Sequence, residues 1–198
     1  MVDPLLGPWA DLVNIGTRKA MAGLSQMIGS DIDVTSLTLR RVPVAEISNL
    51  FGGPDTEAVG IYLTVSGSAD GHLMLMYEPK IACAFIDMLM GEAPNTTKVI
   101  DGMGRSALGE MGNIIGAFFL SAIADATGLS LSPSPPTVMT DMAGALLDVV
   151  SADILLTADE TYLAEATFLT QGHDISGVFM VMPTEELLDA LLNATKAA

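Results

Sequence analysis

Residues 106–136 read SALGEMGNIIGAFFLSAIADATGLSLSPSPP, and the rest of the chain can be interpreted around this stretch. Its apolar residues recur about every 3.6 positions, which is the period of a helix with one buried face. Three polar residues, Ser106, Glu110 and Asn113, fall together on another face of that helix. We therefore predict a long helix over 104–127 whose polar stripe a partner surface can approach.

Composition narrows the functional classes. The chain has 198 residues, half of them apolar, and a formal net charge of −16. Such an acidic protein is a poor partner for nucleic acid or an anionic membrane, because both require clustered cations. The central apolar run is too short and interrupted to predict a membrane span. The chain start lacks a basic leader, and a single cysteine excludes an internal disulfide, so we expect a cytoplasmic protein.

Two similar successions of elements follow one another along the chain. The first half predicts a helix over 8–28, a strand over 33–41, a short helix over 44–51, a hairpin of strands 59–66 and 72–77, and a helix over 81–90. A polar connector over 91–103 follows. The second half predicts the long helix, a short helix over 141–150, a strand over 152–158, strands 162–169 and 175–182, and a closing helix over 183–195.

Local matches support a duplication of 8–91 and 104–197 within one domain over 1–198. Asn14-Ile15 matches Asn113-Ile114, and GHLMLM at Gly71 matches GVFMVM at Gly177. We predict an α+β fold with a mostly antiparallel sheet, helices on one side of it, and two long pseudo-symmetric helices on that face.

Common catalytic motifs are missing from the sequence. It has no GxxxxGK[ST], GxGxxG, CxxC, HExxH or GxSxG pattern, and we expect no metal or cofactor of its own. His72 and His173 lie in or beside predicted turns. The stripe of Ser106, Glu110 and Asn113 remains as the candidate site. We expect the glycines beside it to allow close packing of the long helices or of another element.

The spacing Ser106-x3-Glu110-x2-Asn113-x22-Pro136 resembles the signature of the CheC phosphatase family, whose relatives include CheX and FliY. The family is internally duplicated and removes phosphate from the chemotaxis response regulator CheY. The resemblance implies a CheC-like fold and a phosphoaspartate phosphatase, with Asn113 orienting the attacking water and Glu110 docking the receiver domain. Mg²⁺ is then expected on the receiver, and Ser106 and Pro136 support the motif.

The first half departs from this signature. Asn14 is in place, but Asp11 stands where the second half has Glu110, and Leu37 takes the place of the proline. Arg18 adds bulk and charge and could pair with Asp11 or Asn14. We therefore predict that Asp11 and Asn14 form a weaker or inactive second site.

A second hypothesis is a non-catalytic protein-binding module of the chemotaxis or flagellar switch system. The resemblance implies two versions of it: a module like the middle domain of the switch protein FliM, or one that binds the receptor deamidase CheD. The predicted helix over 141–150 is a candidate protein-contact surface. A complete motif in one half favours catalysis.

Overall fold

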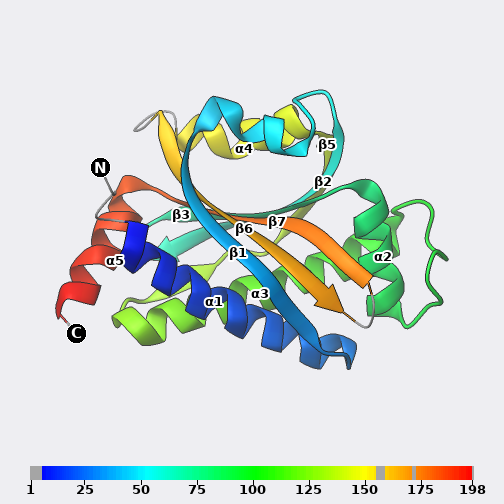
Figure 1. Ribbon diagram of the computed structural model, residues 1–198, viewed down its shortest axis with the longest axis horizontal. Coiled ribbons are helices and arrows are strands. Elements are labelled where there is room, and N and C mark those ends of the chain that lie inside the picture. Colours follow the sequence, from blue (N-terminus) through cyan, green and yellow to red (C-terminus); the bar gives the residue numbers. More distant parts are fainter. Residues whose placement is uncertain (1–5, 155–158, 171–172, 198) are drawn as a thin grey trace.

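The computed structural model describes residues 6–154, 159–170 and 173–197 (Figure 1). In chain order the elements are α1 (Leu6–Ile28), β1 (Ile32–Pro43), the 3₁₀ helix η1 (Val44–Phe51), β2 (Glu57–Gly67), β3 (Gly71–Tyr77), α2 (Pro79–Met90), α3 (Gly102–Thr127), β4 (Leu131–Pro133), β5 (Thr137–Met142), α4 (Ala143–Ile154), β6 (Glu160–Thr170), β7 (His173–Pro183) and α5 (Glu185–Ala197).

The described strands form one sheet in the order β1-β6-β7-β3-β2-β4, with β5 also paired to β2. Every pairing between described strands is antiparallel, so the predicted α+β class with an antiparallel sheet is confirmed. The strands of the two halves are interleaved. β1 pairs with β6 from Ile32↔Thr170 to Pro43↔Glu160, and β2 pairs with both β4 and β5.

One face of the sheet is covered by α1 and α3, which lie side by side as predicted (Figure 1). Trp9 of α1 and Phe119 of α3 are both almost fully buried there. They share one core cluster with Leu63 of β2 and with Leu73 and Leu75 of β3.

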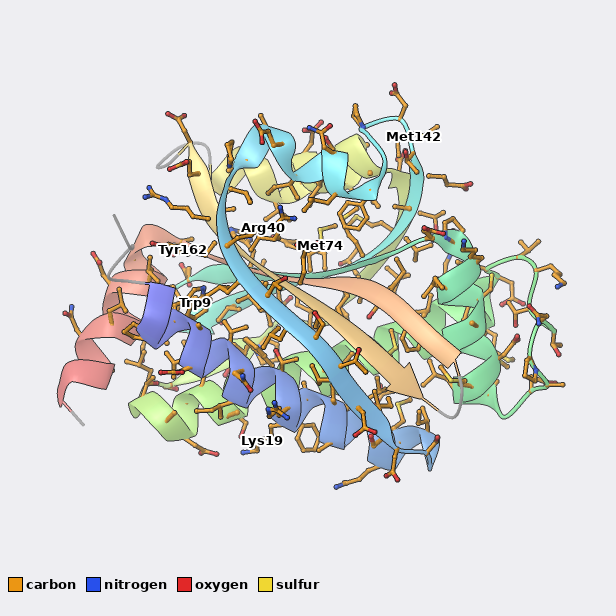
Figure 2. The ribbon with its side chains drawn as sticks, viewed as in Figure 1. Trp9, Lys19, Arg40, Met74, Met142 and Tyr162 are labelled. Carbon is orange, nitrogen blue, oxygen red and sulfur yellow. The ribbon has the colours of Figure 1, made fainter. Side chains whose placement is uncertain are left out.

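The opposite face carries η1 and α4, so the prediction that the helices lie on one side of the sheet is wrong (Figure 1). Met74 and Met76 of β3 point into this second cluster, where they meet Ile47 of η1 and Leu146 of α4. Figure 2 shows Met74 between the sheet and these two short helices. Every residue of β3 is buried, because both faces of this strand are covered.

The segment after α3 differs from the sequence prediction in two places. Residues 131–142 form β4 and β5 along β2, although no strand was predicted there. The predicted strand over 152–158 is wrong at residues 152–154, which are the last turn of α4, and 155–158 lie outside the described residues. Leu146, Leu147 and Val150 follow helical spacing and are buried, which explains why the helix continues.

Helix α3 is long and apolar enough to cross a membrane by length and composition alone. We did not expect this from the sequence, because only a short, interrupted apolar run was considered there. It has 26 residues, and its apolar window has a mean hydropathy of 1.5. Half of that window is buried inside the protein. Such packing against α1 and the sheet is typical of the core helix of a soluble protein.

The strands β3 and β7 place matched residues of the two halves opposite each other. The match of GHLMLM with GVFMVM makes Met74 equivalent to Met180, and these two residues are register partners. A local two-fold axis between the halves would place them in this way. The duplication itself stays a prediction.

Glycines bring α3 directly against β2. A Cβ atom at Gly112 would lie 2.5 Å from Cγ2 of Ile61, and one at Gly116 would lie 2.9 Å from Cδ2 of Leu63. The expected close packing is therefore present at these two positions, and the second element is the sheet. At Gly109 the nearest atom, Cγ2 of Val138, is 3.8 Å from the Cβ position, which is an ordinary contact.

The connector between α2 and α3 is tied down by one buried carboxylate. Asp87 is 2% exposed and accepts hydrogen bonds from the backbone N–H groups of Thr96 at 3.0 Å and Thr97 at 2.8 Å. Burial alone would raise the pKa of Asp87, but the hydrogen bonds from Thr97, Thr96 and Asn95 hold the pKa below its ordinary value. The next residues of the connector end at Asp101, which caps α3 by accepting from the N–H of Gly104 at 2.8 Å.

We expect Gly112→Ala and Gly109→Ala to change stability in opposite directions. Either alanine improves helix propensity by up to about 1 kcal/mol. At Gly112 the new methyl group collides with the buried Ile61, and overpacking of this kind costs about 1–3 kcal/mol. Urea unfolding should show a loss for Gly112→Ala and a gain for Gly109→Ala. Equal stability of the two variants would contradict the close approach of α3 to β2.

We expect Asp87→Asn to lower the free energy of unfolding by about 1–3 kcal/mol at neutral pH, because the buried side chain then offers one acceptor oxygen to the two N–H groups that the carboxylate accepts from. A lowered folded-state pKa stabilises the fold above the unfolded pKa of about 4, and this contribution is lost as the pH falls through the folded value. The difference between wild type and variant should therefore shrink in acid. Asp125→Asn, at an exposed ion pair with Lys19, is the control. A difference independent of pH would contradict the role of Asp87.

Candidate functional site

The polar stripe predicted from the sequence lies on the outer face of α3. Ser106, Glu110 and Asn113 are all exposed, whereas Leu108 and Met111 on the opposite face are buried in the core. The helical period thus separates the residues that hold the helix in place from those that face outwards. The stripe is free to meet a partner.

An open groove of about 680 Å³ runs along this stripe. Helix α3 forms one wall, and the chain from β4 into β5 forms the other. The groove is lined by Gly102, Arg105, Ser106, Gly109, Glu110, Asn113, Pro133, Ser134, Pro135, Pro136 and Val138. All four positions of the motif, separated by up to 30 residues in the sequence, therefore line the same depression.

The proline-rich wall is fixed to β2. The N–H of Ser134 donates to the carbonyl oxygen of Thr64 at 2.9 Å, and the hydroxyl oxygen of Ser134 accepts from the N–H of Thr64 at 3.0 Å. Pro133 pairs with Val65 at the edge of the sheet, where a residue without an N–H is tolerated. Pro136 lies beside α3, with its Cβ atom 3.4 Å from the Cβ position of Gly112. The same close approach that packs α3 on the sheet thus sets the width of the groove.

The groove offers hydrogen bonding and charge. The amide of Asn113 can donate and accept, the carboxylate of Glu110 only accepts, and the guanidinium of Arg105 only donates. Among the residues that the structure describes, no group of three or more His, Cys, Asp and Glu side chains could hold a metal ion. Glu110 and Arg105 are the two charged residues that line the groove.

The groove also contains residues that the motif does not identify. Arg105, Pro133, Ser134 and Val138 line it in addition to the four motif positions. Arg105 precedes Ser106, and its helical position predicts a place on the same side of α3. Pro133, Ser134 and Val138 could not be placed at the groove from the sequence, because β4 and β5, in which or between which they lie, were not predicted.

The corresponding residues of the first half do not line this groove. Asp11 and Asn14 are exposed on α1, and neither lines the groove beside α3. The Nε–H of Arg18 donates to Oδ1 of Asn14 at 2.7 Å, which is one of the two pairings expected from the sequence. Leu37, at the place of the proline, lies on β1 and packs against the core. Asn14 therefore has an occupied acceptor, and a leucine of β1 takes the place of the proline.

Comparison with known proteins finds matches at the level of sequence. The sequence profile of the CheC-like family matches residues 103–140, the part of the chain that forms the groove. The CheY-P phosphatase CheC of Bacillus subtilis strain 168 is 26% identical over 189 residues, which cover 93% of this chain and 90% of the relative.

Two solved structures share the fold. The crystal structure of Thermotoga maritima FliY superimposes with a TM-score of 0.80 at 21% identity, covering 100% of this chain and 99% of FliY. The FliM middle domain from H. pylori superimposes with a TM-score of 0.63 at 11% identity, covering 97% of this chain and 99% of that domain. The chain is thus similar to the CheC-like family over residues 103–140, is similar to a CheC protein over most of its length, and shares its fold with FliY.

Proposed function

We propose that the protein is a phosphatase that hydrolyses the aspartyl phosphate of a CheY-type receiver domain. The observation that carries this proposal is the convergence of Ser106, Glu110, Asn113 and Pro136 on one open groove. The curated relative named CheY-P phosphatase CheC supports the same substrate. We expect the protein to act in the cytoplasm together with its receiver.

The proposed chemistry requires little from the groove. An aspartyl phosphate is a reactive acyl phosphate, and the receiver supplies the Mg²⁺ that neutralises its charge. Water attacks phosphorus while the bond from phosphorus to the aspartate oxygen breaks, which releases the carboxylate and inorganic phosphate. The phosphatase needs to place this water in line with the breaking bond, and no cofactor of its own takes part.

Asn113 is suited to orient the water, because its amide can accept one hydrogen bond from the water and donate another to a phosphate oxygen. Its place on a rigid helix fixes that amide relative to the groove wall. Glu110, one turn away on the same face, can pair with a lysine beside the receiver's phosphorylation site. This pair would also offset the repulsion between an acidic protein and an acidic pocket.

A second candidate function is a non-catalytic binding module. The fold match to the FliM middle domain favours it, because that structure shows that the fold is not confined to proteins named as phosphatases. Binding to a CheD-type deamidase is a further form of this alternative, with the exposed side of α4 as a candidate contact. Binding of such a partner without any effect on dephosphorylation would support the module.

We expect Asn113→Ala to slow dephosphorylation of a phosphorylated CheY-type receiver about 100-fold, because the attacking water loses its orienting group. Glu110→Lys should mainly weaken receiver binding, since it reverses the charge that meets the lysine. Phosphate loss is followed over time against the receiver's own rate of hydrolysis. Asn193→Ala, at an exposed amide of α5 outside the groove, is the matched control. Equal rates for wild type, Asn113→Ala and Glu110→Lys would contradict the catalytic proposal.

We expect Asn14→Ala to leave at least about half of the activity, because Oδ1 of Asn14 is engaged by Arg18 and Asn14 lies outside the groove beside α3. The same assay compares Asn14→Ala with Asn113→Ala. The ranking of the two sites is wrong if Asn14→Ala abolishes activity while Asn113→Ala preserves it.

A further inference from the structure

The two charged residues of the groove, Arg105 and Glu110, lie on opposite sides of the row of α3 residues that faces the groove. Ser106, Gly109 and Asn113 follow one line along α3, and the helical period of about 100° per residue places Arg105 on one flank of it and Glu110 on the other. The Cα atoms of Arg105 and Glu110 are then roughly 9 Å apart. The groove therefore presents one cation and one anion at a fixed separation.

Arg105 differs from four of the eight lysines and arginines of this chain. Lys19, Arg40, Arg41 and Lys80 each form an ion pair with a neighbouring carboxylate. Arg105 is exposed, and it has no ion pair or side-chain hydrogen bond within the part of the chain that the structure describes. In a protein with three times as many acidic as basic side chains, this cation is available to a partner.

Two large apolar side chains shortly before Arg105 in the chain are exposed. Val99 is 77% exposed and Met103 is 65% exposed, the largest values among the exposed large hydrophobic residues that the structure describes. Met103 lies seven residues before Glu110, so the two share one side of α3 about two turns apart. Met103 thus lies on α3 between Gly102 and Arg105, which line the groove, and an exposed apolar residue beside a charged groove is typical of a protein contact.

We propose that Arg105 and Met103 extend the receiver-docking surface beyond the motif, with Arg105 pairing to an acidic side chain at the rim of the receiver's phosphorylation pocket. This inference rests on the proposed function. Glu110 meets a cation of the receiver and Arg105 meets an anion, so only one orientation satisfies both charges. Met103 packs on an apolar residue of the same receiver surface. Receivers without an acidic residue at that position would bind more weakly.

The test compares two pairs of matched variants. Arg105→Gln and Lys80→Gln each remove one positive charge, at the groove and on α2 respectively. Met103→Gln and Met90→Gln each replace an exposed methionine, beside the groove and at the end of α2. The measurements are kcat and KM for the phosphorylated receiver at low and high salt, and the Kd for the beryllofluoride-loaded receiver.

Arg105→Gln is expected to raise KM and Kd about fivefold to tenfold at low salt, to leave kcat within about twofold, and to flatten the salt dependence. Met103→Gln is expected to raise KM and Kd about threefold. Lys80→Gln and Met90→Gln should match the wild type. The proposal is overturned if Arg105→Gln and Lys80→Gln give the same KM, Kd and salt dependence.

Asn113→Ala separates a failure of this inference from a failure of the proposed function. If Asn113→Ala stops dephosphorylation while Arg105→Gln binds the receiver as the wild type does, only the docking role of Arg105 is overturned. If Asn113→Ala retains full activity, only the role of Asn113 is overturned. If the wild type itself does not speed dephosphorylation, the phosphatase proposal fails, and the docking proposal that rests on it is overturned too.

Discussion

The direct contact between α3 and β2 determines most of what this structure can do. At Gly112 and Gly116 no side chain separates the helix from Ile61 and Leu63 of the sheet. Since the inner face of α3 is held so close, its outer face stands beside the proline-rich chain that pairs with the edge of β2. A groove results between two elements that are both anchored to the same strand. The shape of the groove therefore depends on how α3 packs on β2 in the core.

This arrangement suits chemistry in which most of the reactive apparatus belongs to the partner. A groove with one amide, one carboxylate and one guanidinium can orient a molecule and hold a partner, and the covalent change then occurs in groups that the partner brings. The corresponding residues of the first half have different surroundings. Asn14 is held by Arg18, and the position of the proline is taken by Leu37 of a strand that packs on the core. The two amides, both exposed on long helices, thus differ in their surroundings.

The sequence predicted the parts of this fold whose signal is local. The long helices and the β2–β3 hairpin follow from clear periodicity, and the motif positions follow from helical spacing and from their resemblance to a family. The strands β4 and β5 were missed because Pro133, Pro135 and Pro136 favour a loop. Pro133 ends β4 at the edge of the sheet, where a residue without an N–H is tolerated, and Pro135 and Pro136 lie between the two strands.

The covering of both faces of the sheet was missed for a different reason. The alternation of apolar and polar residues in β2 indicated a sheet with one buried face. The nearly continuous apolar run of β3 is instead typical of a strand that is buried on both faces. Arg105 was overlooked because the motif that defined the site begins one residue after it.

The interleaving of the strands has a consequence for how the chain is synthesised. β1 is made early, but its neighbour β6 leaves the ribosome only after more than a hundred further residues have been added. Until then the emerging protein holds a twelve-residue strand without its partner, and long-range pairing of this kind forms slowly. The two halves cannot mature as separate modules. An unpaired β1 could instead join β6 of a second copy, so exchange of this strand between molecules competes with folding.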